Sequence, residues 1–445
     1  MDEKLKLILD VFRKTKAQTD ARTARDIEEN RKGDLTVAVT DGGRPVERAH
    51  IALRQRTHDF RFGCNLFMLD ELETAEKNER YKQLFADTFN LATLPFYWCD
   101  LEPERGKPRF TKDSPRVYRR PTPDLCVEYC KAHGIEPKLH CLNYDRWSPR
   151  WLPQDVGEIK RLLERRIREI AARYADDIPG MGVTNELLST ETHDPMRPGE
   201  STVFYREPDI VEWSFAVARK YLPHNRLIIN ETNNVWRGFR YDRSQYYMQI
   251  ERALSRGAEI DEIGLQYHLF YLTEENVRRT YKEMCSAQNI LNVLDQLAKL
   301  GRPLQITEIT IPAYSGTDED EQAQAELLTA LYTLWFSHPA MEAIIYWNLV
   351  DGYAAWAKQG DMTQGENRYY GGLLRFDFSE KPAYRALKKL TDETWRTKLD
   401  ADFSGTLQTR GFYGEYDAEI TANGKTVTKR LHLQKGAENR VEIAL

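Results

Sequence analysis

The most constraining feature of this sequence is a regular alternation of short apolar segments with longer helical ones from about residue 58 onward. Amphipathic stretches such as Val156–Tyr174 and Glu207–Leu222 separate several of the apolar segments. The eight apolar segments are Phe60–Phe67, Leu91–Trp98, Pro137–Tyr144, Gly180–Asn185, Leu227–Asn230, Ile263–His268, Leu304–Ile309 and Ala343–Leu349. Eight strands separated by helices match a (β/α)8 barrel in number and in length. We therefore predict the α/β fold class, with a TIM barrel over residues 58–395.

The segments on either side of the predicted barrel have different patterns. Residues 1–31 carry apolar side chains on one helical face and form a predicted N-terminal helical segment. Residues 32–57 contain two alternating stretches around an Asp41-Gly42-Gly43 turn, and residues 402–445 contain three more. We predict that these two β regions pack together as an accessory module; the alternative is two unrelated additions to the barrel. The C-terminal region has few aromatic side chains to bind a sugar, which favours a structural role over a carbohydrate-binding one.

Composition limits the class of protein. Of the 445 residues, 41% are hydrophobic, 11% aromatic and 30% charged, which excludes fibrous and disordered classes. The net charge of −5 argues against a nucleic-acid partner. No apolar stretch approaches the roughly 20 residues of a membrane helix, and the charged N-terminus does not resemble a signal peptide. The six cysteines form no Cys-x-x-Cys pair and are interpreted as buried thiols. We predict a cytoplasmic location, although a trimmed secretion signal would leave the same sequence.

Several predicted strands end in polar or ionisable residues, and such ends meet at one rim of a barrel. The residues are Asn143, Glu186, Glu231, His268, Glu308 and Asp351. Glu186 and Glu308 each end a strongly apolar strand, where a carboxylate is costly unless it is used or paired. A pair of carboxylates can cleave a glycosidic bond, because one protonates the leaving oxygen while the other attacks the sugar or activates water. The alternative is that each glutamate forms a structural salt bridge.

The residues around this pair are suited to hold a sugar. Asn185 directly precedes Glu186 and offers an amide to a hydroxyl group. Gln266 and His268 are two residues apart, so they point to the same side of one strand. Trp347 ends another strand and would form an apolar floor for a sugar ring. Taken one at a time, the glutamine, the histidine and the tryptophan are equally compatible with ordinary core positions.

These residues lie in stretches that resemble glycoside hydrolase family 10, which is best known for endo-β-1,4-xylanases. From about Phe60 to Leu390 the matching stretches are Leu101-Glu102-Pro103-Glu104-Arg105-Gly106, Thr184-Asn185-Glu186, Ile263-Gly264-Leu265-Gln266-Tyr267-His268, Ile306-Thr307-Glu308, Trp347 with Asp351, and Gly372-Leu373-Leu374-Arg375-Phe376-Asp377 followed by Lys381-Pro382-Ala383-Tyr384. Each stretch is short, but their order and spacing make the set fairly specific. The resemblance implies a (β/α)8 barrel and a retaining mechanism, with Glu186 as acid/base and Glu308 as nucleophile. It also implies that Asn185, Gln266, His268 and Trp347 surround the sugar at the cleavage subsite.

The sequence departs from the family where the non-reducing side of the glycan is held. After the second strand the family has a Glu-Asn pair and then a Lys before Trp, whereas this chain has Thr93, Leu94 and Tyr97. After the third strand the family pattern is His-x-Leu-x-Trp-His; His140 matches its first histidine, and Asp145 replaces its second. The loss of a bulky cation at Tyr97 would open room for a larger sugar, and Asp145 would accept hydrogen bonds from its hydroxyls.

Two further departures lie after later strands. Thr310 replaces the usual Asp two residues past the nucleophile, so it cannot supply a negative charge to His268. The family's Asn-Asp-Tyr-Asn becomes Asn230-Glu231-Thr232-Asn233 and loses its tyrosine. Asn143 and Trp356 complete the predicted substrate-binding residues.

We therefore predict a retaining β-glycoside hydrolase whose specificity is shifted toward a small β-glycoside or a short oligosaccharide. An ordinary intracellular endo-1,4-β-xylanase that acts on xylo-oligosaccharides and a non-catalytic sugar-binding barrel are the alternatives. The predicted partner is a carbohydrate substrate; nucleic-acid and membrane partners, a metal site and a cofactor are not predicted. The oligomeric state, the identity of the sugar, and endo or exo cleavage stay open at this point.

Overall fold

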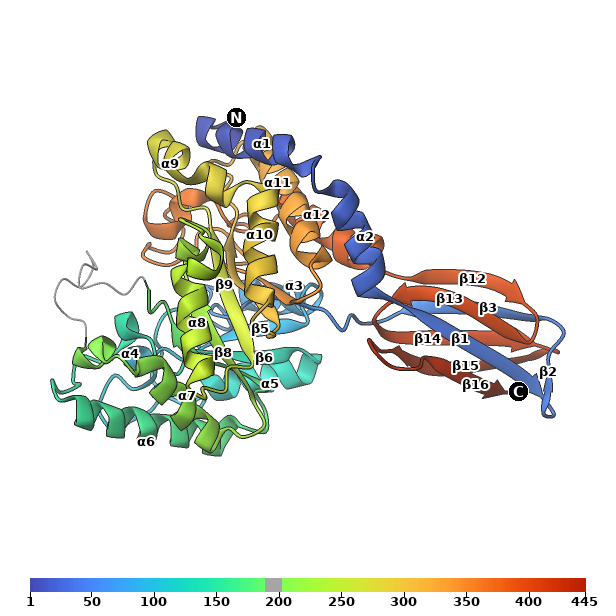
Figure 1. Cartoon of the computed structure of the whole chain (residues 1–445), viewed down its shortest axis with the longest axis horizontal. Helices are drawn as coiled ribbons and strands as arrows, with labels where there is room; N and C mark the ends of the chain where they lie inside the picture. The colour runs from blue at the N-terminus through green and yellow to red at the C-terminus, as the bar shows by residue number, and fades with distance from the viewer. Residues whose placement is uncertain (189–201) are drawn as a thin grey trace.

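The computed structural model describes residues 1–188 and 202–445, and its largest part is the predicted barrel. Eight parallel strands close in the order β10-β11-β4-β5-β6-β7-β8-β9, which confirms the (β/α)8 fold (Figure 1). They are β4 (Arg61–Asn65), β5 (Leu91–Pro95), β6 (Glu136–His140), β7 (Gly180–Asn185), β8 (Arg226–Glu231), β9 (Glu262–His268), β10 (Leu304–Thr310) and β11 (Met341–Tyr346). Most of their residues are buried on both faces, as expected of parallel strands that helices cover.

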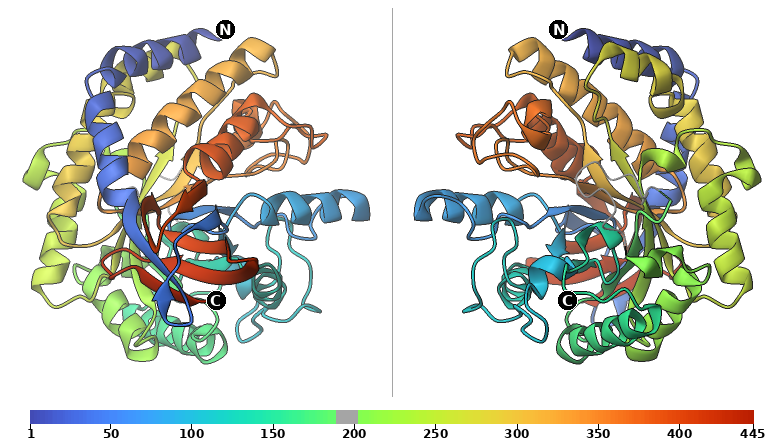
Figure 2. Two further views of the ribbon diagram at one scale, coloured as in Figure 1. Left: turned by 90° about the vertical axis from the view of Figure 1, so that its right-hand side faces the viewer. Right: turned by 90° about the vertical axis from the view of Figure 1, so that its left-hand side faces the viewer.

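Helices surround the barrel on its outer face (Figure 2). In α6 (Val156–Tyr174) one face is buried through Leu163, Ile167 and their neighbours, and the opposite face carries charged residues. Asp155 caps the amino end of this helix, because its side chain accepts a hydrogen bond from the backbone nitrogen of Glu158 at 2.7 Å. The other barrel helices are α3 (Ala75–Ala86), α5 (Pro123–His133), α7 (Ile210–Tyr221), α8 (Gln245–Ser255), α9 (Glu274–Met284), α10 (Ala287–Ala298), α11 (Asp318–Ser337) and α12 (Pro382–Lys389).

Short helical turns shape the loops between these elements. They are α4 (Trp98–Leu101), η1 (Asp145–Trp147), η2 (Val203–Arg206), η3 (Asn233–Val235), η4 (Tyr241–Arg243), η5 (Gly365–Tyr369) and η6 (Leu390–Thr394). Three of them, α4, η1 and η3, follow the carboxyl ends of β5, β6 and β8 closely, so they help to form the rim where the predicted site residues lie.

Strands from both ends of the chain form two four-stranded sheets beside the barrel. In one sheet, β1 (Lys32–Asp41) pairs antiparallel with β13 (Thr406–Phe412) and parallel with β16 (Arg440–Ala444), and the short β2 (Arg44–Pro45) pairs with β1. In the other, the order is β12 (Lys398–Phe403), β3 (Ala49–Gln55), β14 (Gly414–Ala422) and β15 (Lys425–Leu433). Apolar residues such as Val37, Ile51 and Ile420 fill the space between the sheets. The two sheets therefore form a small β-sandwich with its own core.

The sequence interpretation missed two strands of this sandwich. β12 and β13 alternate exposed with only half-buried residues, so their apolar signal is weak. In the structure the C-terminal β region begins at Lys398, whereas the sequence interpretation placed its start at residue 402.

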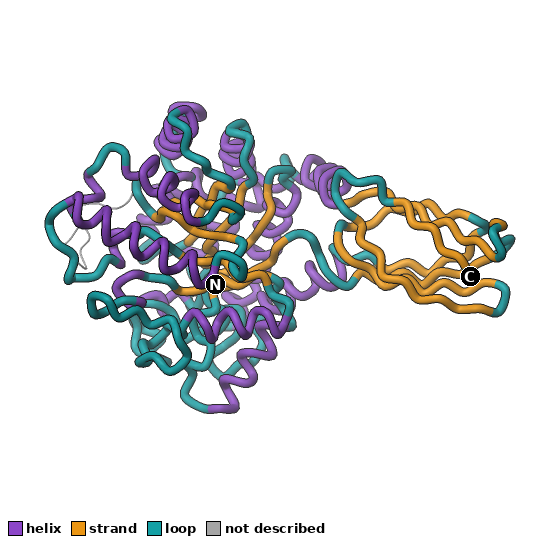
Figure 3. Tube along the Cα trace, turned by 90° about the horizontal axis from the view of Figure 1, so that it is seen from below, coloured by secondary structure: helices purple, strands orange, loops and turns teal. Residues whose placement is uncertain are grey.

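The sandwich joins the barrel at the amino ends of the barrel strands. Only a short link separates the end of β3 from the start of β4. Arg31 donates to the backbone oxygens of Phe336, His338 and Met341, which lie between the end of α11 and the start of β11. The Phe336 ring stacks on Trp395 at 4.1 Å between centroids. Figure 3 shows the sandwich as a separate strand-rich body at one end of the molecule. The carboxyl-end rim of the barrel is therefore left uncovered by the sandwich.

Residues 1–31, predicted to be helical, form two helices. They are α1 (Glu3–Lys16), which packs against α9, α10 and α11, and α2 (Asp20–Arg31), which leads into β1. Within residues 1–188 and 202–445, no helix is long and apolar enough to cross a membrane. Five of the six cysteines are buried; Cys99 is half-exposed, contrary to the interpretation that all six are buried.

Candidate active site

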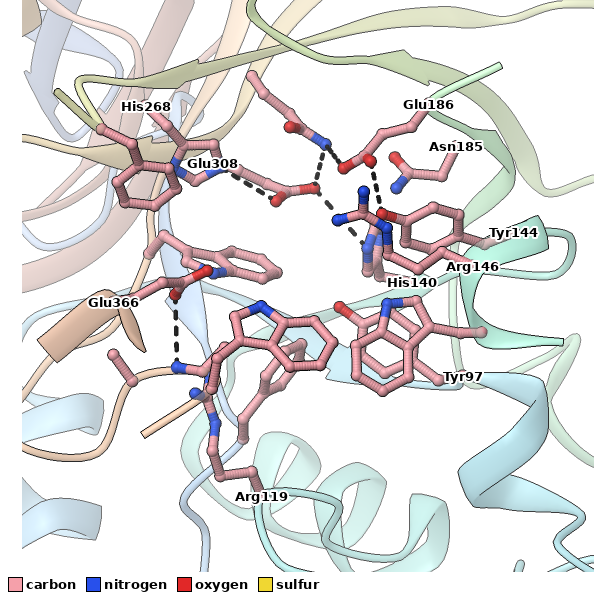
Figure 4. Close-up of a pocket in the computed structure, with 18 of the residues that line it drawn as sticks. Tyr97, Arg119, His140, Tyr144, Arg146, Asn185, Glu186, His268, Glu308 and Glu366 are labelled. Carbon is pink, nitrogen blue, oxygen red and sulfur yellow. Dashed lines mark hydrogen bonds and ion pairs between the residues drawn. The ribbon is translucent and has the colours of Figure 1, made fainter. Parts of the chain in front are cut away.

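A cavity of about 800 Å³ lies at the carboxyl ends of the barrel strands and brings most of the predicted site residues together (Figure 4). Those that line it are Tyr97, His140, Asn185, Glu186, Gln266, His268, Glu308, Trp347 and Trp356. Glu186 directly follows β7, and Glu308 lies near the end of β10. These strands are not neighbours, but the closed barrel directs their carboxyl ends to the same rim.

Gln266 holds the two glutamates close to each other. Its Nε2 donates to Glu186 Oε1 at 2.9 Å and to Glu308 Oε1 at 3.0 Å. Because one nitrogen contacts both oxygens, these oxygens lie at most about 6 Å apart; retaining glycosidases have carboxyl groups about 5–5.5 Å apart, and inverting ones about 6.5–9.5 Å. The pair therefore fits the retaining geometry.

The surroundings of Glu186 raise the pKa of its carboxyl group. Burial and the charge of Glu308 raise the pKa of Glu186 above the usual carboxyl value, against the hydrogen bonds from Tyr144 and Gln266. Tyr144 Oη donates to Glu186 Oε2 at 2.5 Å. The backbone of Glu186 has φ of +57°, a left-handed conformation that costs energy in a residue other than glycine and is common at functional sites. A general acid needs this raised pKa.

Glu308 has the opposite electrostatics. Burial raises its pKa, but the hydrogen bond from His268 and nearby positive charge, including that of Lys138, outweigh burial, so the pKa lies below the usual carboxyl value. His268 Nε2 lies 3.3 Å from Oε2, and Asn230 Nδ2 donates to Oε1 at 3.2 Å. An ionised carboxylate is the form that a nucleophile needs. The environments thus push the two pKa values apart in the direction of an acid and a nucleophile.

Thr310 faces His268, as its position two residues past Glu308 suggests. Its Oγ1 lies 2.9 Å from His268 Nδ1. Because the ionised Glu308 can only accept, His268 Nε2 is the donor to it, and the threonine hydroxyl can donate to a neutral Nδ1. An aspartate at this position could only accept. The threonine therefore lets a neutral imidazole satisfy both neighbours.

Two buried polar residues of β6, His140 and Lys138, lie near Glu308. His140 Nε2 lies 3.7 Å from Glu308 Oε1, and burial lowers the pKa of His140 to about 4, so its imidazole is neutral at neutral pH. Lys138 lies two residues earlier on the same strand and is buried, which lowers its pKa to about 8. At neutral pH the positive charge on this side of Glu308 thus comes from the lysine rather than from His140.

The loop after β5 forms an aromatic and basic wall of the cavity. The Tyr97 ring lies 4.8 Å from that of Trp147 and 5.9 Å from that of Phe67. The guanidinium of Arg120 lies 4.3 Å over Tyr97 and forms an ion pair with Asp100 at 2.7 Å. An arginine from the same loop thus stacks on the tyrosine and places a cation beside it, and the expected room for a larger sugar stays a prediction.

Two predicted substrate-binding residues lie outside the described lining of the cavity. Asp145 begins η1, and its Oδ1 accepts hydrogen bonds from the backbone nitrogen and the hydroxyl of Thr202, both at 2.9 Å. Asn143 donates to Ser214 Oγ at 3.2 Å. Both side chains are buried and bind other parts of the barrel, so the sugar contact expected of each stays a prediction.

Sequence reasoning missed several residues that border the cavity. They include Phe67, Arg119, Arg120, Tyr144, Arg146, Trp147, Phe270 and Glu366. Phe67 and Tyr144 are the last residues of the first and third apolar segments, so their positions at strand ends are a signal for them. The others lie on loops or short turns without periodicity, and only the folded loops bring them to the site.

The fold and the site define a class: a (β/α)8 barrel with two buried, adjacent carboxylates of opposite electrostatics at the carboxyl ends of its strands. The model of glycosyl hydrolase family 10 matches residues 58–390, and the chain belongs to this family.

Relatives and solved structures agree with this membership. The chain is 24% identical over 420 residues to the anti-sigma-I factor RsgI6 of Acetivibrio thermocellus, covering 92% of this chain and 48% of that protein. It is also 24% identical over 366 residues to endo-1,4-beta-xylanase 2 of Arabidopsis thaliana, covering 79% and 29%. The fold is similar to the crystal structure of native xylanase 10B from Thermotoga maritima, with a TM-score of 0.59, 22% identity, and 76% and 96% of the two chains covered. The chain spans less than half the length of these two curated relatives.

The hydroxyl of Tyr144 offers a test of the acid/base assignment. Tyr144→Phe removes a donor that stabilises the charged form of Glu186, so the pKa of Glu186 should rise further. The alkaline limb of kcat/KM against pH should move upward by about one pH unit, while the acid limb stays in place. The control is Tyr129→Phe, whose hydroxyl donates to the backbone of Lys82 outside the cavity. A downward shift, or an equal shift in both variants, would contradict the assignment.

Proposed function

We propose that this protein is a retaining β-glycoside hydrolase that uses Glu308 as nucleophile and Glu186 as acid/base. The observation that carries this proposal is the bridging contact of Gln266, which keeps the two carboxyl groups within the retaining distance. Membership of glycosyl hydrolase family 10 supports it.

In the first step, a carboxylate oxygen of Glu308 attacks the anomeric carbon while the bond to the leaving oxygen breaks. Glu186 gives its proton to that oxygen, so the aglycone leaves as a neutral alcohol. In the second step, the Glu186 carboxylate takes a proton from water, whose oxygen attacks the same carbon and releases Glu308. Two inversions at one carbon leave the product with the configuration of the substrate.

We propose further that the specificity is shifted toward a small β-glycoside or a short oligosaccharide. The support is that Thr93 and Leu94 in β5 replace the family's Glu-Asn pair, and that the stacked Tyr97 and Arg120 of the following loop replace its lysine. A site that loses donors and acceptors no longer favours the same hydroxyl groups. The second candidate is an ordinary endo-1,4-β-xylanase, which the names of several relatives favour.

A substrate panel separates these two candidates. We expect measurable hydrolysis of an aryl β-glucoside or β-xyloside and weak or absent release of reducing sugar from xylan. Each lost sugar contact costs roughly 0.5–1.5 kcal/mol, so several losses together reduce the rate on xylan by orders of magnitude. Equal rates on xylan and on the best aryl glycoside would favour the ordinary xylanase. No turnover of any member of the panel, with binding retained, would favour a sugar-binding barrel instead.

A further inference from the structure

Two tryptophans from distant loops meet at one side of the cavity. Trp147 lies on η1 after β6, and Trp356 lies on the loop after β11. β4 and β5 separate β6 from β11 in the closed barrel, so these loops reach across the ends of two strands. The two indole rings stack with centroids 5.2 Å apart, and both residues line the cavity. We call this contact the tryptophan bridge.

The tryptophan bridge is part of a continuous aromatic wall. The centroid of the Trp147 ring lies 4.8 Å from that of Tyr97. Phe67 lies 5.9 Å from Tyr97 and 5.1 Å from Trp347, again between ring centroids. These residues follow the ends of β4, β5, β6 and β11, which are consecutive in the barrel. The aromatic wall therefore covers one side of the cavity over four neighbouring strands.

The loop that carries Trp356 is held in place by its neighbours. Gly365 has φ of +49° and packs so closely that a side chain there would collide with the Trp356 backbone. The backbone nitrogen of Glu366 donates to the backbone oxygen of Ala355 at 2.9 Å. Trp356 itself has φ of +62°, a left-handed conformation that persists where the surroundings fix it. Its ring is therefore a fixed part of the aromatic wall, although 46% of the residue is exposed.

The aromatic wall stands beside the predicted nucleophile. Trp347 belongs to this wall, and its ring lies 6.0 Å from that of His140 and 6.2 Å from that of His268. Nε2 of His140 lies 3.7 Å from the carboxylate of Glu308, and Nε2 of His268 lies 3.3 Å from it. Figure 4 shows Tyr97 on the opposite side of the cavity from Glu308. Aromatic rings thus bound the space between Glu308 and the tryptophan bridge.

We propose that this space holds a single sugar, so that the substrate class is a β-linked glycan with a free non-reducing end, from which the enzyme removes one terminal sugar. The nucleophile bonds to the anomeric carbon, so the sugar on its side of the cleaved bond is the non-reducing one. A second sugar on that side would collide with the stacked rings of the tryptophan bridge. This inference rests on the proposed glycosidase function, because it names the bond that the same site cleaves.

The test compares aryl glycosides that differ by one sugar. Release of nitrophenol from 4-nitrophenyl β-xyloside requires room for one sugar beside Glu308, and release from the β-xylobioside requires room for two. The β-glucoside and the β-cellobioside form a second pair. In the pair that is hydrolysed faster, we expect initial nitrophenol release from the monosaccharide to have a kcat/KM at least about tenfold higher. The disaccharide glycoside should first lose its terminal sugar, and chromatography should detect the nitrophenyl monosaccharide that is left.

Variants of Trp356 locate the effect. Trp356→Ala should open this side of the cavity and lower the monosaccharide-to-disaccharide ratio at least about tenfold, chiefly through faster release from the disaccharide. Trp356→Phe keeps a ring and should keep most of the ratio. Tyr241→Ala is the control, since Tyr241 is an exposed aromatic residue on η4 and is absent from the described cavity lining. If Trp356→Ala does not fold, the ratio in the wild-type enzyme decides the question.

The outcomes separate this inference from the proposed function. Faster nitrophenol release from the disaccharide by the wild-type enzyme, or an unchanged ratio in folded Trp356→Ala, would overturn the single-sugar space and leave the glycosidase function intact. Absence of hydrolysis of all four glycosides would reject the glycosidase function. A crystal structure of Glu308→Gln with xylotriose then decides the inference: one sugar ring between residue 308 and the tryptophan bridge supports it, and two rings overturn it.

Discussion

Replacing Glu308 with alanine should lower kcat/KM for every cleaved β-glycoside by about four orders of magnitude or more, because the covalent intermediate forms on this carboxylate. Added azide should restore part of the activity, since a small anion can enter the space left by the side chain and attack the anomeric carbon directly. A single attack inverts the configuration, so the product should be the α-glycosyl azide. Nuclear magnetic resonance of the product distinguishes the two anomers.

The matched control is Glu104→Ala, which removes a glutamate paired with Lys107 in a loop and absent from the described cavity lining. Its activity should equal that of the wild type. Near-normal activity of Glu308→Ala, or rescue by azide with a retained product, would remove Glu308 from the nucleophile role. A melting curve of each variant shows whether a loss of activity reflects a loss of folding.

Replacing Glu186 with alanine should affect substrates according to their leaving groups. A general acid typically contributes a factor of about 10² to 10⁴, and this factor is lost where the leaving oxygen needs a proton. Dinitrophenolate leaves without protonation, so the rate of the first step on dinitrophenyl glycosides should be nearly unchanged. Methyl glycosides and oligosaccharides should lose the full factor. The measurement is kcat/KM over a series of aryl glycosides of graded phenol acidity.

The wild-type enzyme provides the reference slope of rate against leaving-group acidity, and Glu186→Ala should give a much steeper one. The alkaline limb of the pH profile should also disappear in this variant, because that limb reports the loss of the Glu186 proton. An equal loss across all leaving groups would instead indicate that Glu186 binds the substrate without donating a proton.

The sequence predicts the barrel and its pair of adjacent buried carboxylates well because both produce strong local signals. Each barrel strand is a short apolar run, and a carboxylate at the end of such a run is conspicuous on energetic grounds. Glu186 and Glu308 are found in this way without any knowledge of which strands are neighbours. The closed barrel then brings their ends together as a consequence of strand order.

The rest of the site is not accessible to this reasoning because it depends on how loops fold. Asp145 has the right residue type and position for a sugar contact, yet its carboxylate accepts hydrogen bonds from Thr202, a residue outside the predicted strands. Arg119 and Arg120 have no periodic signal, and only the path of the long loop after β5 places them at the cavity. β12 and β13 escaped detection for a different reason, since their residues alternate between exposed and only half-buried and give a weak apolar signal.

The pairing of β1 with both β13 and β16 has a consequence for the order of events during translation. When β1 and β3 leave the ribosome, their partner strands have not yet been made, because the whole barrel is encoded between them. Their unpaired edges and apolar faces stay exposed until the last strands emerge, which is a period of aggregation risk. A chain that terminates early within the barrel never buries them. Completion of the sandwich thus marks a chain that has been translated through the barrel, and products that end within the barrel carry an exposed segment that proteases and chaperones can recognise.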